Sequence, residues 1–197
     1  MFLSGCPILE ELYISIVPFD SDESLTCIEW KNFCLSNLTR AAIHCISTYF
    51  PLKAVNNTPS LRLELNQVNY HGLIPTFHNL TQLELIFIEY SCQFLVEVLN
   101  HCPKLQKLDL CQDEIWNRKK DRENWVDPDV VPQCLSLHLR SCNIFNFYGL
   151  QDELMLASYM LKSASILQTM KIWCPVPISL LISFYHAIAR FSDPLAE

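Results

Sequence analysis

A six-residue pattern of leucines, Leu-x-x-Leu-x-Leu, recurs along the chain and restricts its fold more than any other feature. Two copies are complete, LTQLEL at 80–85 and LQKLDL at 105–110. Looser copies, with other residues at some leucine positions, begin at residues 9, 38, 60, 134 and 167. Most intervals between successive copies fall in or near the 20–29 residues typical of leucine-rich repeats. The sequence Cys-Pro-x-Leu-x-x-Leu also occurs twice, at 6–12 and 102–108, so the repeat is not a chance clustering of leucines.

The last three positions of each copy alternate between apolar and polar residues, which predicts a strand with one buried face. Two stretches between copies have helical spacing instead. The stretch 91–102 places four apolar residues on one side: Phe94, Leu95, Val98 and Leu99. The stretch 149–164 places five on one stripe, with Asp152 and Glu153 in the first turn, where the helix dipole favours them: Leu150, Leu154, Ala157, Leu161 and Ala164.

A strand followed by a helix, repeated, forms a parallel sheet with the helices outside it. No single unit can bury its own apolar face, so the units must stack. The predicted fold class is therefore α/β: a leucine-rich-repeat solenoid with a curved parallel sheet and with helices and loops on its convex side.

Composition removes several classes of function. Half of the 197 residues are apolar and 18% are charged, which is typical of a folded protein. Only three glycines are present, and no Gly-rich phosphate-binding loop can be found. A net charge of −7 argues against a general nucleic-acid-binding protein, which needs clustered Lys and Arg. The apolar stretch near the C-terminus, residues 175–191, is too short to predict a membrane-spanning helix, and His186 and Arg190 interrupt it.

The ten cysteines and six histidines do not indicate a metal site or a nucleophile. The cysteines form no C-x-x-C pair, and the N-terminus does not have the pattern of a signal peptide. We therefore expect reduced, structural thiols in a cytoplasmic or nuclear protein. The histidines form no H-x-x-x-H pattern, so no catalytic residue, metal ligand or cofactor is predicted.

At these repeats the chain resembles the plant F-box/FBD/leucine-rich-repeat proteins. The resemblance rests on LSGCPILEELYI (3–14), IPTFHNLTQLELIF (74–87) and FLVEVLNHCPKLQKLDL (94–110), and residues 125–172 are similar to the family's FBD segment. It implies four parts: leucine-rich repeats at 1–112, a polar loop at 113–129, an FBD-like segment at 130–172 that continues the solenoid, and a divergent apolar C-terminal cap at 173–197. An alternative for the last part is sequence foreign to the family, with exposed apolar surface.

In that family an N-terminal F-box binds the Skp-type adaptor of an SCF ubiquitin ligase, and the repeats and FBD are thought to present a substrate. Because residue 1 is expected to lie inside a repeat already, we expect no F-box within these 197 residues. The resemblance implies a non-catalytic protein-interaction module that binds a protein substrate or peptide, and a Skp-type adaptor only if an F-box is supplied. The alternative is a remnant or isoform without a ligase role that competes for substrates. An enzyme is a more distant alternative.

In such a solenoid the third and fifth residues of each copy face away from the core, into the concave face, about 4.8 Å from their neighbours on adjacent strands. The third positions read Glu11, Arg40, Arg62, Gln82, Lys107, Ser136 and Thr169, and the fifth positions read Tyr13, Ala42, Glu64, Glu84, Asp109, His138 and Lys171. The candidate partner-binding residues among them are Arg40, Arg62, Glu64, Gln82, Glu84, Lys107, Asp109 and His138.

This arrangement would stack three carboxylates, Glu64, Glu84 and Asp109, beside a mostly basic column. Two interpretations are open. In the first, Arg62 and Lys107 neutralise the carboxylates diagonally, and the face is an ordinary solvated surface. In the second, the two columns recognise a polar peptide that carries both charges.

Overall fold

The computed structural model describes residues 6, 8–16, 35–45, 50–65, 73–87, 92–112, 128 and 130–174. The expectations for the apolar cap beyond residue 174, and for most of the polar loop 113–129, lie outside these residues. Every structural statement below refers to the described residues.

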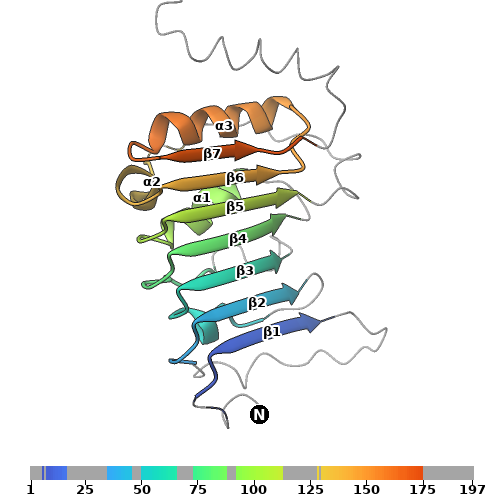
Figure 1. Ribbon diagram of the computed structural model, residues 1–197, viewed down its shortest axis with the longest axis vertical. Helices are drawn as coiled ribbons and strands as arrows, with labels where there is room; N and C mark the ends of the chain where they lie inside the picture. Colours follow the sequence, from blue (N-terminus) through green and yellow to red (C-terminus); the bar gives the residue numbers. More distant parts are fainter. Residues whose placement is uncertain are drawn as a thin grey trace, which may run out of the picture.

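The described residues form one sheet of seven parallel strands, whose order in space is their order in the sequence (Figure 1). The predicted fold class is thereby confirmed: the protein is an α/β leucine-rich-repeat solenoid. Every strand begins at the third residue of a repeat, once the repeats of β3 and β6 are taken to start at Thr58 and Leu139, as explained below. The strands are β1 (Glu11–Ile16), β2 (Arg40–Cys45), β3 (Ser60–Leu65), β4 (Gln82–Phe87), β5 (Lys107–Gln112), β6 (Ser141–Phe145) and β7 (Thr169–Ile172).

The core lies between the sheet and the connecting segments, whose described residues include four helices. These are η3 (Leu52–Val55), α1 (Cys92–Asn100), α2 (Gln133–Leu137) and α3 (Gln151–Ser163). Their buried residues join the inward-facing strand residues in a single apolar cluster. The central leucines of the repeats, such as Leu83 and Leu108, are at most 2% exposed. Corresponding residues on the edge strands, such as Leu12 and Met170, are only partly buried, because each edge strand has a neighbour on one side.

A backbone contact recurs at five of the six boundaries between neighbouring strands of the described sheet. The carbonyl of Thr81, at the second position of its repeat, accepts hydrogen bonds from the N–H groups of both Gln106 and Lys107 in the next repeat, each at 2.9 Å. The same paired contact recurs at the carbonyls of Glu10, Pro59, Gln106 and Arg140. At Glu10 and Pro59 a threonine hydroxyl of the following repeat, Thr39 or Thr81, donates to the same oxygen. These contacts hold successive strands in a regular parallel register.

The helix predicted over 91–102 is confirmed as α1, with Phe94, Leu95, Val98 and Leu99 buried as expected. The helix predicted over 149–164 is also present as α3, but the predicted apolar stripe is partly wrong. Leu161 is 52% exposed, whereas Met160 is fully buried. The buried side of the helix is thus rotated from the predicted one and carries Glu153, Leu156, Ala157, Tyr159 and Met160.

The strand predicted at 134–139 is wrong. Residues Gln133–Leu137 form α2, which buries Cys134 and Leu135 on one side. The strand of this repeat is β6, which begins at Ser141 and pairs with β5 from Lys107 onward. The six-residue pattern therefore starts at Leu139, which is fully buried, and continues with Cys142 and Ile144 in the two other apolar positions. Both β6 and β7 lie in the segment predicted to be FBD-like, and both belong to the common sheet.

Candidate functional site

The face of the sheet opposite the core, here called the concave face, carries three rows of side chains that cross the strands. We name them from the direction of the strands. The amino-end row is Glu11, Arg40, Ser60, Gln82, Lys107, Ser141 and Thr169. The middle row is Tyr13, Ala42, Arg62, Glu84, Asp109, Asn143 and Lys171. The carboxyl-end row is Ser15, His44, Glu64, Ile86, Cys111 and Phe145.

Five of the eight candidate residues lie in the rows that the sequence predicts for them: Arg40, Gln82, Glu84, Lys107 and Asp109. Arg62 and Glu64 lie one row further along because the register of β3 differs by two residues from the predicted one. Ser60, not Arg62, is the partner of Gln82 on β4 and of Arg40 on β2. The repeat of β3 therefore starts at Thr58, which replaces the first leucine and is fully buried.

His138 and Ser136 do not lie in any of the three rows. Ser136 is part of α2, and His138 is the residue at its C-terminal end. Asn143 occupies the position in the middle row that His138 was predicted to fill. The placement of His138 on a strand of the concave face is thus wrong, since the segment before β6 is a helix.

The corrected register replaces the expected column of three carboxylates by local ion pairs. Arg62 on β3 lies directly across from Glu84 on β4, with 3.1 Å between Nη1 and Oε1. Glu64 lies across from His44 on β2, and its Oε2 is 2.6 Å from Nδ1 of the histidine. The Arg62–Glu84 ion pair therefore runs directly across the strands and not diagonally, while the His44–Glu64 contact is an ion pair only if the histidine is protonated.

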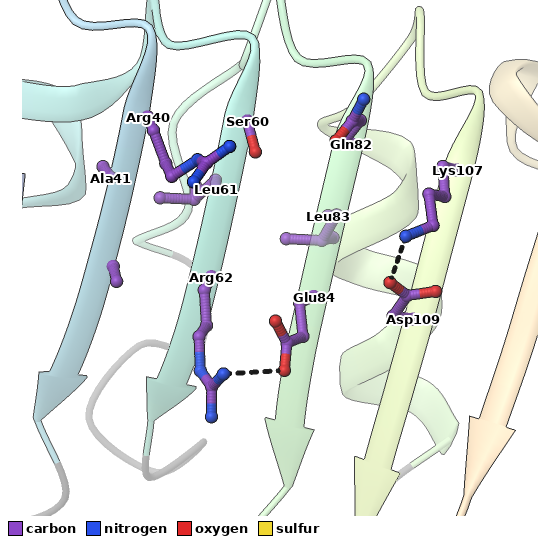
Figure 2. A pocket seen from close by; sticks show the side chains of 11 residues that line it. Arg40, Ala41, Ser60, Leu61, Arg62, Gln82, Leu83, Glu84, Lys107 and Asp109 are labelled. Carbon is purple, nitrogen blue, oxygen red and sulfur yellow. Dashed lines mark ion pairs between the residues drawn. The ribbon is translucent and has the colours of Figure 1, made fainter. Parts of the chain in front are cut away.

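The Arg62–Glu84 pair forms a first cluster of charges. A second cluster, made by Lys107, Asp109 and Asn143, lies next to it on β5 and β6. Nζ of Lys107 is 2.7 Å from Oδ2 of Asp109, two residues later on the same strand (Figure 2). The other carboxylate oxygen of Asp109 accepts a hydrogen bond from the amide of Asn143 on β6. Of the predicted column, only Glu84 and Asp109 remain direct neighbours, and each has a cationic partner that offsets their repulsion.

The concave face is hollowed at this place, and residues of both clusters form part of the lining of the hollow. A depression of about 320 Å³ extends over β2 to β5, and its polar lining comes from Arg40, Ser60, Arg62, Gln82, Glu84, Lys107 and Asp109 (Figure 2). Small residues on β2 and β3, Ala42 and Ser60, form part of its floor. Positively and negatively charged side chains lie side by side in this lining. The depression is therefore suited to bind polar and charged groups.

Sequence reasoning missed the aromatic end of the concave face. The rings of Phe145 and Trp173 are stacked, with centroids 6.1 Å apart and planes inclined by 4°. Trp173 remains 55% exposed. Both residues follow the sixth position of a repeat, and so does His44. The alternation of the strand would have identified them had it been followed beyond the six-residue pattern, because every second residue of a strand shares a face.

No group of three or more His, Cys, Asp or Glu side chains in the described part of the chain could hold a metal ion. None of the described helices is long and apolar enough to cross a membrane. Buried cysteines lie in the core and not at the depression; burial raises the pKa of the Cys134 thiol to about 12, so this thiol is protonated at neutral pH.

Comparison with known proteins agrees with the architecture. Residues 127–172, which include α2, β6, α3 and β7, match the FBD family model. The resemblance to plant F-box/FBD/leucine-rich-repeat proteins is confirmed. Several Arabidopsis thaliana proteins with F-box and FBD names match most of the chain at modest identity. No solved structure matches it.

Three of these relatives show the extent of the match. An FBD-associated F-box protein is 24% identical over 218 residues, which cover 87% of this chain and 52% of the relative. An F-box/FBD/LRR-repeat protein is 28% identical over 220 residues, covering 84% of this chain and 49% of the relative. A second F-box/FBD/LRR-repeat protein is 31% identical over 118 residues, or 57% of this chain and 27% of the relative. The chain thus spans about half the length of the first two relatives.

Proposed function

We propose that the chain is a non-catalytic protein-recognition module, and that it corresponds to the part of an SCF-type F-box protein that binds the substrate. The concave face of the solenoid binds a polar segment of the partner protein. One observation carries this proposal: the concave depression over β2 to β5, lined by polar and charged side chains from four successive strands, of which those on β3, β4 and β5 form ion pairs. The F-box and FBD names of the relatives support it.

The depression suits an extended peptide better than a small molecule. Its lining is shared by four neighbouring strands and includes the small residues Ala42 and Ser60. Four of its charged groups are held in pairs: Lys107 with Asp109, and Arg62 with Glu84. A polar peptide can replace or extend these pairs without leaving a buried charge, because the side chains of both pairs remain partly exposed.

The test is a selection of random dodecapeptides displayed on phage against the immobilised 197-residue chain. Enriched peptides are then synthesised and their binding is measured with two double variants. In the first, Glu84→Lys is combined with Lys107→Glu, which reverses one charge in each cluster and preserves the net charge. In the second, a matched control, Glu10→Lys is combined with Lys53→Glu, which reverses two exposed charges outside the depression.

We expect the concave double variant to weaken peptide binding at least about tenfold, since like charges then face each other in both clusters. The control should bind as the wild type does. Circular dichroism and thermal melting of all three proteins check that the fold is intact. Equal binding by the two variants would remove the concave face as the binding surface, and a selection without enriched peptides would argue against recognition of linear segments.

A second experiment tests the proposed role of this chain within an SCF-type ubiquitin ligase. We expect residues 1–197 alone to fail to retain a Skp-type adaptor in a pull-down, and a fusion that supplies an F-box at the N-terminus to retain it. Retention of the adaptor by the unfused chain would contradict the assignment of this chain to the substrate-binding side.

A further inference from the structure

Arg40 differs from the other two cations of the depression. The side chains of Arg62 and Lys107 each have a carboxylate within ion-pair distance. Arg40 is exposed, and within the described part of the chain its guanidinium forms no ion pair and no hydrogen bond. The five N–H donors of this group are thus open to a ligand.

The surroundings of Arg40 complete a site for an acceptor. Its side chain extends from β2 toward β3, where Ser60 lies beside it (Figure 2). The next residue in the row is Gln82, whose amide is also exposed to the depression. Ser60 and Gln82 both offer hydrogen-bond donors, and Ser60 is short enough to leave space above the strand. The row therefore presents three consecutive donor side chains across β2, β3 and β4.

We propose that Arg40, Ser60 and Gln82 bind the carboxylate of an aspartate or glutamate in the partner polypeptide. This inference rests on the proposed function and names the chemistry that the concave face selects. A guanidinium binds a carboxylate through two parallel N–H···O bonds, which gives directional as well as electrostatic recognition. The polypeptide lies across the strands, along the amino-end row.

A carboxylate fits this site better than a phosphate dianion. Glu11 lies opposite Arg40 on β1, and Glu84 lies in the adjacent row of β4, within the depression. Arg62 already pairs with Glu84, so in the described part of this hollow Arg40 is the one cation without an ionic partner, and it must face both Glu11 and a bound anion. A group with a single negative charge experiences less repulsion from these two carboxylates than a group with two.

The test uses the dodecapeptides selected against the wild-type chain. Each acidic residue of a selected peptide is replaced in turn by its amide, Glu by Gln or Asp by Asn, and dissociation constants are measured by fluorescence polarisation. The same peptides are titrated with Arg40→Gln, and with Lys53→Gln as a matched control that removes an exposed positive charge outside the depression.

We expect one acidic residue whose neutralisation weakens binding to the wild type by about fivefold to tenfold. The same replacement should change binding to Arg40→Gln by less than about twofold, because the partner charge has already been removed. The control should behave as the wild type does. Glu11→Gln should strengthen binding of the acidic peptide, since it removes a competing negative charge from beside Arg40.

The two proposals fail in distinguishable ways. If selected peptides lose affinity on Glu84→Lys with Lys107→Glu but show no acidic residue coupled to Arg40, the carboxylate site is wrong while the proposed function stands. If a phosphoserine at the coupled position binds more tightly than aspartate and this gain depends on Arg40, the assignment to a carboxylate is wrong. If no peptide is enriched, both proposals are overturned together.

Discussion

Nη1 of Arg62 lies 3.1 Å from Oε1 of Glu84, directly across the boundary between β3 and β4. The pair shows that charges on the concave face are matched between neighbouring repeats. It also places an arginine where the sequence pattern predicted a glutamate, so the electrostatic character of this face depends on the register of a single strand.

The Arg62–Glu84 pair should contribute little to stability. Its side chains are 52% and 38% exposed, so water screens the attraction strongly. A double-mutant cycle with Arg62→Gln and Glu84→Gln should give a coupling energy of about 0.2–1 kcal/mol in urea denaturation. A coupling well above this range would show that the pair is far less accessible to solvent than described.

Met160 and Leu161 are consecutive residues of α3 and should respond in opposite ways to truncation. Met160 is fully buried and Leu161 is 52% exposed. Met160→Ala should lower the free energy of unfolding by about 2–5 kcal/mol because it leaves a cavity in the core. Leu161→Ala should change it by less than about 1 kcal/mol. Denaturant titration compares the two variants, and a larger loss at Leu161 would support the orientation expected from the sequence instead.

Glu153 connects α3 to the chain before it. It is 3% exposed, and its Oε2 accepts hydrogen bonds from the backbone N–H groups of Tyr148, at 3.0 Å, and Leu150, at 2.8 Å. Glu153→Leu removes the acceptor for both groups and should cost about 1–3 kcal/mol.

Replacement by Gln provides the comparison, because it keeps an acceptor oxygen and should cost less than Leu. Asp152→Asn is the control at the neighbouring, partly exposed position. Stability is measured by thermal melting, and equal effects of Gln and Leu would indicate that the two hydrogen bonds do not contribute.

Buried thiols should make the fold sensitive to alkaline pH. Burial, and secondarily the charge of Asp109, raises the pKa of Cys142 to about 12 from its ordinary value of 9.0. Below pH 9 the thiol is protonated in both states and stability does not depend on it. Above pH 9 the unfolded chain releases the proton first, so the free energy of unfolding should fall by about 1.4 kcal/mol per pH unit until the folded-state pKa is reached.

The measurement compares wild type with Cys142→Ala in urea titrations between pH 8 and 10.5. The alanine variant starts from a lower stability, because the buried side chain is smaller, but its loss with rising pH should be shallower. The comparison of slopes cancels the contribution of the tyrosines and lysines that also titrate in this range. Parallel slopes would contradict the prediction.

The sequence by itself determined the architecture. Leucines at two-residue intervals specify a strand, and the recurrence of this pattern every 20–34 residues specifies parallel strands stacked in sequence order. Phe94, Leu95, Val98 and Leu99 likewise identified α1. The strand and helix patterns depend on residues a few positions apart, and the recurrence of the pattern depends only on order along the chain, so both can be recognised without knowledge of the contacts in space.

The tertiary structure alone decided which side chains are neighbours on the concave face. In β3, Leu61, Leu63 and Leu65 alternate with polar residues, so a shift of two positions keeps the same residues on the same face and the local pattern cannot distinguish the two registers. Burial of Thr58 in place of a leucine, and the hydrogen bonds from Thr81 and Gln82 to the carbonyl of Pro59, fix the register. The alternation in CLSLHL is similarly ambiguous, and its first four residues belong to the helix Gln133–Leu137, which buries Cys134 and Leu135 in the core. Register depends on contacts between repeats, so it is settled only when the repeats stack.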